Sequence, residues 1–215
     1  MRNAVAAALG AALLAVTAAG CGGDSSSSSR TGTAATAPAA ECPKAWRGDW
    51  QQIANRIQAS VYCPSWMPPP LDGAIEGEYS NVSGVSDDRS YLVSFLFLDR
   101  EAGGVAGEIH VNFRGYPGST EIPTCEDTRT DRGKTTRVEI PCFSDPRGIK
   151  EVGGEEVTVY TVNQGIDQWH VLYAWEHDAS LYTVSQHVIA PTPLTKAMRN
   201  LDRVMRGLER LEPAT

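Results

Sequence analysis

Five cysteines carry the most defined chemistry in this 215-residue chain, at positions 21, 42, 63, 125 and 142. A cysteine can be a nucleophile, a metal ligand, half of a disulfide or the acceptor of an acyl chain. No two of them stand in a C-x-x-C spacing, and none has a histidine within a few residues. The spacing argues against a zinc site and gives no support for a catalytic thiol, which leaves acylation and disulfides.

The residues before Cys21 have the layout of a secretory signal. Arg2 supplies a positive head, and residues 4–20 form an uncharged, alanine-rich stretch that ends in small residues. This stretch is shorter than the ~20 strongly apolar residues that a membrane span needs. Ala18-Ala19-Gly20-Cys21 resembles a bacterial lipobox, at which a signal peptidase cleaves before a cysteine that is then diacylated. We therefore expect residues 1–20 to be a lipoprotein signal peptide and Cys21 to be lipidated; ordinary secretion and a retained transmembrane helix are the alternatives.

Residues 21–40 form a segment of Gly, Ser, Thr and Ala with few charges. Such a segment buries too little apolar surface to offset its ordering entropy, so it is expected to be a flexible tether. Two acyl chains on Cys21 supply stable anchoring, which places the protein outside the cytoplasm on a membrane. Residues 41–215 remain, enough for a single domain with a sizeable core.

Lipidation of Cys21 removes the odd cysteine from the count. The remaining four would lie in an oxidising compartment, where disulfides persist, and they allow three pairings. We favour Cys42–Cys63 with Cys125–Cys142 because these pairings close the shortest loops. Bridged Cα atoms lie within ~7 Å of each other, so a helix cannot fill the whole interval from 42 to 63.

Histidines are the second group able to do chemistry. In a hairpin whose turn is formed by residues 177–180, His170 lies opposite His187, and His110 can join them from another strand. Three imidazoles on one exposed face can hold Zn²⁺ or Cu²⁺. Because the spacing fixes no third ligand, we favour the alternative that they are solvated or packing residues, and we expect no metal and no other cofactor.

Three further groups of residues have ordinary structural interpretations as well as functional ones. The acidic pairs Asp87-Asp88 and Glu155-Glu156 are expected to be solvated. Neighbours on a strand point to opposite faces, so neither pair can form an acid/base dyad. The tryptophans can line a carbohydrate or lipid cleft, but core and rim packing is favoured. A basic stripe can lie against anionic headgroups or a wall polyanion, or can be an ordinary solvated helix face. These groups are Asp87-Asp88 and Glu155-Glu156; Trp46, Trp50, Trp66, Trp169 and Trp175; and Lys196, Arg199, Arg203, Arg206 and Arg210.

Neither catalysis nor nucleic-acid binding has support in the sequence. The chain contains no G-x-S-x-G, S-x-x-K, H-E-x-x-H or phosphate-loop motif, so we do not expect the protein to be an enzyme. It has 19 basic and 26 acidic residues, and loss of Arg2 with the signal leaves a formal net charge of −8. An acidic domain of this kind is a poor partner for nucleic acid.

Two helices and a set of strands must position these residues. A short helix is predicted over about 50–59 with Asp49 as its N-cap, and a long amphipathic helix from Pro193 to about Leu211. Residue alternation and short connections predict an antiparallel sheet, with residues 119–134 as a long loop pinned at Cys125. The predicted fold class is α+β, a curved antiparallel sheet packed by both helices. The predicted strands are 91–98, 108–113, 156–162, 168–176 and 181–188, with weaker ones at 74–80 and 135–140.

The β-hairpin over 168–188 allows its pairing to be predicted residue by residue. Trp175 is expected opposite Tyr182, Tyr173 opposite Val184, and Trp169 opposite Val188, all on a core-directed face. In strand 108–113, alternation predicts Ile109, Val111 and Phe113 inside, with Glu108, His110 and Asn112 outside.

The segments "VYCPSWMPPPLDG", "EVGGEEVTVYTV" and "WHVLYAWEHDASLYTVSQHV", followed by the closing helix, resemble a broad class of uncharacterised bacterial surface lipoproteins. The resemblance implies a Tyr-x-Pro opening, an antiparallel sheet, a Trp/Tyr hairpin and a terminal amphipathic helix, and it carries no active site. The expected function is a membrane-anchored binding or interaction module of the cell envelope, whose partner is a cell-wall polymer or an envelope protein. The alternative is a carrier or sensor of a small apolar ligand held between sheet and helix.

Overall fold

The computed structural model describes residues 40–72, 78–98, 108–163, 167, 169–189 and 192–214. The chain divides into two units, residues 1–37 and 38–215, and only the second contains described residues. The predicted signal peptide, the lipidated Cys21 and nearly all of the tether lie outside the described residues. Within them, no helix is both long and apolar enough to cross a membrane.

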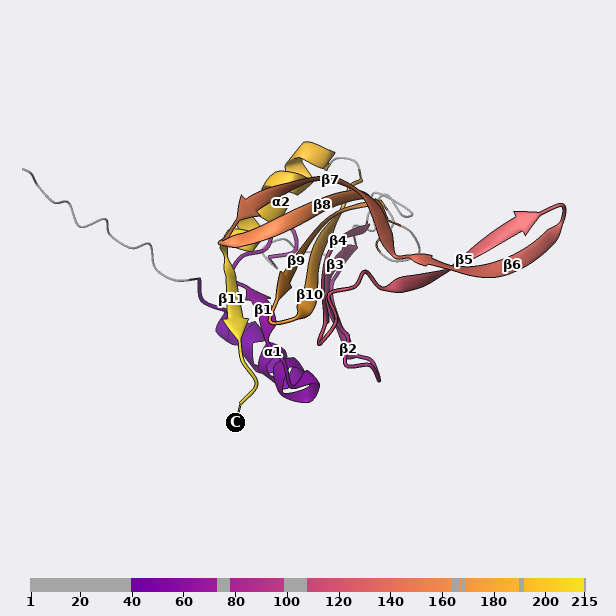
Figure 1. Cartoon of the computed structure of the whole chain (residues 1–215). Helices are drawn as coiled ribbons and strands as arrows, with labels where there is room; N and C mark the ends of the chain where they lie inside the picture. Colours follow the sequence, from indigo (N-terminus) through magenta and orange to yellow (C-terminus); the bar gives the residue numbers. More distant parts are fainter. Residues whose placement is uncertain are drawn as a thin grey trace, which may run out of the picture. The chain divides into compact units, whose positions relative to one another are not determined.

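A seven-stranded antiparallel sheet forms the body of this unit (Figure 1). The predicted α+β class with an antiparallel sheet is confirmed, while the curvature of the sheet stays a prediction. The strands, in their order across the sheet, are β2 (Glu78–Val85), β3 (Tyr91–Leu98), β4 (Glu108–Tyr116), β10 (Ser180–His187), β9 (His170–His177), β8 (Glu155–Asn163) and β7 (Phe143–Val152).

The β9–β10 hairpin has the predicted register. Trp175 pairs with Tyr182, Tyr173 with Val184, and His170 with His187. The two turn residues, Asp178 and Ala179, both have positive φ, as a type I′ turn requires. One prediction here is wrong: Trp169 does not face the core but is 79% exposed, because its own φ of 62° turns the chain before β9 begins.

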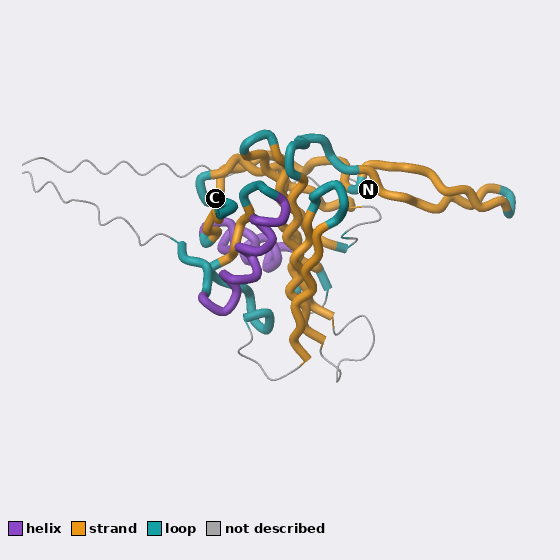
Figure 2. Tube along the Cα trace, turned by 90° about the horizontal axis from the view of Figure 1, so that it is seen from below, coloured by secondary structure: helices purple, strands orange, loops and turns teal. Residues whose placement is uncertain are grey.

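Both helices pack on one face of the sheet, called the inner face here. Helix α1 (Lys44–Ile57) buries an apolar stripe that includes Trp50, whose ring lies edge-on to Phe113 with centroids 5.5 Å apart. Helix α2 (Leu194–Arg206) buries Leu201 against the same core. The hydroxyl of Tyr173 joins α2 to the sheet by donating to Asp202 Oδ1 at 2.8 Å, and it lies 3.2 Å from the carbonyl oxygen of Met198. Figure 2 shows both helices beside the strands.

The helix boundaries differ from those predicted. Helix α1 begins six residues before the predicted start, and its N-cap residue is Pro43 rather than Asp49, without a side-chain capping bond. The predicted C-terminal helix is present, but its predicted end near Leu211 is wrong, since α2 ends at Arg206. The following residues form β11 (Leu208–Leu211), which pairs with β1 (Val61–Pro64) and buries Leu211. Pairing with β1 outweighs the helical pattern because it satisfies the backbone of both short strands.

The predicted long loop over 119–134 is also wrong. Its second half forms β5 (Thr124–Asp131), which pairs with β6 (Lys134–Pro141) through a turn at Arg132 and Gly133, both with positive φ. Most of this hairpin is exposed on both sides, so it carries no apolar alternation that could reveal a strand. In both Figure 1 and Figure 2 the hairpin projects away from the sheet.

Both predicted disulfides are confirmed. Cys42–Cys63 has a Cα–Cα distance of 5.5 Å and lies in the main core beside α1 and β1. Cys125–Cys142 has a Cα–Cα distance of 4.8 Å and closes the base of the β5–β6 hairpin. Two intact disulfides indicate an oxidising compartment outside the cytoplasm.

Candidate functional site

The face of the sheet opposite the two helices, called the outer face here, brings together the three histidines and Glu156, which the sequence singled out. Alternation along the strands directs one residue in two to this face. The expectation that this face is exposed is wrong at its centre, where Asn112, His170 and His187 are 6%, 3% and 5% exposed, so the two histidines pack rather than being solvated. It holds two features, a cluster of histidines at one end and a groove at the other.

The histidine cluster consists of His110 on β4, His170 on β9 and His187 on β10. The register places His187 directly opposite His170, and β4 lies on the other side of β10. The ring centroids are 4.3 Å apart for His110–His170, 4.9 Å for His110–His187 and 5.1 Å for His170–His187. One ring nitrogen from each residue lies within 4.8 Å of the other two. The structure thus supplies the third convergent imidazole that spacing alone did not fix.

Two of the three rings, those of His187 and His170, are held through their Nδ1 atoms. His187 Nδ1 lies 3.1 Å from the Glu108 carbonyl oxygen, an acceptor, so Nδ1 carries the proton. His170 Nδ1 lies 3.0 Å from Ser185 Oγ, and that hydroxyl donates to Asp167 Oδ2 at 2.9 Å. Ser185 therefore accepts from His170. These contacts leave Nε2 of both rings with a free lone pair.

His110 differs from the other two rings. Its Nδ1 lies 3.0 Å from Glu108 Oε1, close enough for an ion pair, but it is buried and has no aligned hydrogen-bond partner. Its side chain is 17% exposed and that of Glu108 37%, so the cluster opens to solvent on this side.

The buried carboxylate of Asp167 lies next to the cluster and holds Ser185, the partner of His170. Asp167 Oδ1 accepts from Asn112, and the guanidinium of Arg114 lies 3.2 Å from the same oxygen. Burial alone would raise the pKa of Asp167, but the charge and hydrogen bonds of Arg114, with help from Asn112, hold it below its usual value. Asp167 is thus an anion that orients Ser185. No spacing in the sequence indicated this residue, because the β8–β9 connection that carries it has no periodic pattern.

Burial also sets the charge of the imidazoles. It lowers the pKa of His170 to about 3, although Asp167 opposes the shift. Burial and the neighbouring His187 lower the pKa of His110. Both rings are therefore neutral at neutral pH and keep a lone pair for an electrophile or a metal.

The same contacts argue against serine hydrolase chemistry at this position. A catalytic triad places the histidine between the carboxylate and the serine. Here Ser185 lies between Asp167 and His170, donates its hydroxyl hydrogen bond to the carboxylate and is fully buried. It orients the ring and cannot attack a substrate.

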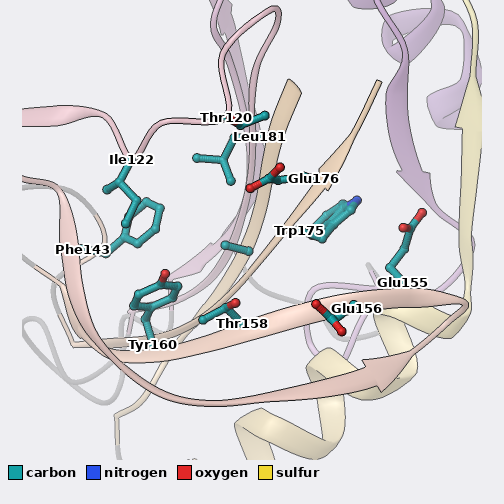
Figure 3. Close-up of a pocket in the computed structure, with 11 residues that line it drawn as sticks. Thr120, Ile122, Phe143, Glu155, Glu156, Thr158, Tyr160, Trp175, Glu176 and Leu181 are labelled. Atoms are coloured by element: carbon teal, nitrogen blue, oxygen red, sulfur yellow. The ribbon is translucent and has the colours of Figure 1, made fainter. Parts of the chain in front are cut away.

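The groove lies over β8, β9 and β10 and encloses about 600 Å³. Figure 3 shows Phe143 and Tyr160 at the left of the groove and Trp175 and Glu156 at the right, with Glu176 between Leu181 and Trp175. The remaining wall comes from the segment that contains Thr120 and Ile122, outside the strands.

A row of carboxylates crosses the strands at the groove. Glu151 on β7 pairs with Glu156 on β8, and Glu176 on β9 lines the same groove as Glu156. Within the described part of the chain none of the three has a cationic partner. Like charges directly opposite each other destabilise a sheet, so this row lacks a structural explanation. The sequence indicated only Glu156, since Glu151 and Glu176 depend on the strand order.

The structure disperses the other residues singled out by sequence. Asp88 accepts from the backbone and hydroxyl of Ser90 in the β2–β3 turn, and Glu155 accepts from Tyr62. Of the tryptophans, Trp50 and Trp175 are buried and Trp169 is exposed, so they do not form one cleft.

The basic stripe is divided between two elements. Lys196, Arg199, Arg203 and Arg206 are exposed on α2, whereas Arg210 belongs to β11. The guanidinium of Arg203 covers the Trp66 ring at 4.0 Å from its centroid, so it packs against the domain as well as carrying charge.

Comparisons with known proteins identify no relative. No protein-family model, no curated protein and no solved structure matches the chain.

Proposed function

We propose that this protein is a lipid-anchored, extracytoplasmic binding module of the cell envelope, which holds a basic segment of another envelope protein in the outer-face groove. The signal-like residues 1–20, the lipobox-like sequence ending at Cys21 and the two disulfides support an anchored location in an oxidising compartment. The observation that carries the binding role is the unpaired carboxylate row that crosses the groove.

Charge complementarity identifies the partner's chemistry. Glu156 and Glu176 line a concave surface of about 600 Å³, and a row of unneutralised like charges there costs stability that a cation can recover. Lysine and arginine side chains bring both a charge and an aliphatic stem, which suits a groove that also contains Phe143 and Tyr160. A basic peptide segment fits this surface better than an anionic wall polymer, which the carboxylates would repel.

The packing of the inner face supports a binding module over a carrier. A small-molecule carrier needs an enclosed cavity of roughly 300 Å³ or more. The space between α1 and the sheet at Trp46, Trp50 and Phe95 amounts to about 30 Å³. Side chains fill this region, and the larger hollow lies on the other face of the sheet.

Fluorescence anisotropy of a labelled oligolysine peptide with the intact protein tests the proposal. Exposed ion pairs contribute about 0.5–1 kcal/mol each, so Glu156→Gln/Glu176→Gln should weaken binding about 5- to 30-fold. The matched control is Glu126→Gln/Glu139→Gln, which removes the same charge from an exposed cross-strand pair on the β5–β6 hairpin. The control should bind like the unmodified protein, and an oligoglutamate peptide should not bind.

Three results would contradict the proposal. The first is that oligolysine does not bind. The second is that both double variants weaken oligolysine binding equally, which would mean that binding depends only on net charge. Preferential binding of an anionic wall polymer would assign the partner to the other class of envelope component and place the contact away from the groove.

A further inference from the structure

The histidine cluster is independent of the groove and of any peptide partner, and it has the composition of a metal site. All three residues project from strands of one sheet, so the backbone that carries them is rigid. All three imidazoles gather on the outer face, and His170 and His187 are buried there. His110 Nδ1 is also buried but has no aligned hydrogen-bond partner, although buried polar atoms usually have one. A metal ion is the common partner of three converging histidines.

We propose that His110, His170 and His187 bind one divalent transition-metal ion of the zinc or copper type. One nitrogen of each ring lies within 4.8 Å of the other two. Nitrogens bound at about 2.1 Å to one tetrahedral ion lie about 3.4 Å apart. Convergence therefore requires movements of about an ångström, which side-chain rotations supply without moving the strands.

The surroundings of the rings are those that orient metal-binding histidines. Such histidines donate Nδ1–H to a carbonyl, a carboxylate or a hydroxyl, which fixes the tautomer and directs Nε2 to the ion. His187 donates to the Glu108 carbonyl, and His170 donates to Ser185, which is itself held by the buried Asp167. These contacts preset two of the three ligands.

The backbone beside His170 gives a second, independent sign of a built site. Asp167 and Trp169 have φ of 54° and 62°, in the left-handed region that non-glycine residues rarely occupy. Asn163 holds this turn by donating to the carbonyls of Asp167 and His170 at 3.1 and 2.8 Å. Strain of this kind collects at functional sites, and here it places Asp167 against Ser185.

The ligand set indicates the class of metal. Three imidazole nitrogen donors suit zinc and copper and do not suit calcium or magnesium, which prefer oxygen. Three protein ligands also leave one coordination position for water or another molecule. That position would lie toward Glu108, on the side of His110 that opens to solvent.

Zinc titration of the intact, metal-stripped protein tests the site, with calorimetry and thermal unfolding as readouts. One Zn²⁺ should bind per chain and raise the Tm. His110→Gln, at the least buried of the three positions, should weaken binding at least 100-fold, and Ser185→Ala about 10-fold as a positioning residue. The matched control is His177→Ala, at the far end of β9 and outside the cluster. It should bind zinc like the unmodified protein.

Cobalt provides a readout that needs no variant. Co²⁺ bound to three imidazoles and a water should give the intense visible absorption of a tetrahedral site, and Zn²⁺ should displace it. The proposal is overturned if neither zinc nor cobalt binds, if cobalt gives only the weak spectrum of an octahedral ion, or if His110→Gln and His177→Ala weaken binding equally.

Discussion

Loss of either disulfide should destabilise the domain by about 3 kcal/mol. The sequence separations are 21 for Cys42–Cys63 and 17 for Cys125–Cys142. The loop-closure entropy of chains of these lengths corresponds to about 3.3 and about 3.1 kcal/mol at 25 °C. For a domain of this size each loss should lower the Tm by about 6–13 °C.

Together the two bridges amount to about 6 kcal/mol, a large part of the 5–15 kcal/mol that stabilises an ordinary domain. The fully reduced protein should therefore be largely unfolded at 37 °C. This dependence is the physical reason for an oxidising location: the same chain in a reducing cytosol would lack the stability to keep its sheet assembled.

Urea unfolding followed by tryptophan fluorescence measures the effect. Cys42→Ala/Cys63→Ala and Cys125→Ala/Cys142→Ala should each lower the midpoint, and chemical reduction of the unmodified protein should give the sum. Cys42 and Cys63 are 1% and 0% exposed, so alanine there also leaves a small cavity and adds about 1 kcal/mol. A loss below about 1 kcal/mol for both pairs, or a reduced protein as stable as the oxidised one, would refute the reasoning.

Three other changes test separate parts of the structure. Cys21→Ser should abolish incorporation of labelled fatty acid and move the protein from the membrane fraction to the soluble fraction; retention of label at another residue would contradict lipidation of Cys21. Tyr182→Phe removes the hydrogen bond from a buried hydroxyl to the Ser60 carbonyl at 3.1 Å and should cost about 1 kcal/mol in urea unfolding; an unchanged midpoint would show that the bond contributes nothing. Gly153→Ala should cost about 2–4 kcal/mol, because φ is +67° and the new Cβ would lie 2.4 Å from the Met205 carbonyl oxygen. Gly154→Ala, with φ of +87° but open space, should cost about 1 kcal/mol, and equal losses at both glycines would show that the contact with α2 is not tight.

The elements that the sequence predicted well are those in which one face is buried and one connection is short. In the β9–β10 hairpin a two-residue turn fixes the register, so the pairing of Trp175 with Tyr182 followed from the turn position alone. The same register set His170 opposite His187. The stripe of α1 was also predictable, because burial of Trp50 and Ile57 depends only on helical spacing.

The elements that were missed lack a local signal. Strand β5 is exposed and polar. Strand β7 contains Pro146 and Gly148, residues that favour a turn in sequence, and its register shifts between them. Strand β11 continues the apolar pattern of α2, and only β1, far away in sequence, provides its partner. Local propensity cannot distinguish these outcomes when a distant strand decides them.

The candidate sites depend on strand order in the same way. His110 joins the other two histidines only because β4 lies next to β10, and Glu176 joins Glu156 only because β8 lies next to β9. Asp167 is positioned by a turn that no residue pattern predicts. Sequence therefore identified the candidate residue types, and the sheet topology determined which of them meet.

Carbodiimide coupling of an oligolysine peptide to the intact protein tests the binding role most directly. The reagent joins a carboxylate to an amine without a spacer, so an amide forms only where the two groups touch. Mass spectrometry should find the peptide attached to Glu156 or Glu176, which line the groove, or to Glu151, which pairs with Glu156. Attachment spread over the exposed acids of the β5–β6 hairpin, or no attachment at all, would contradict the account.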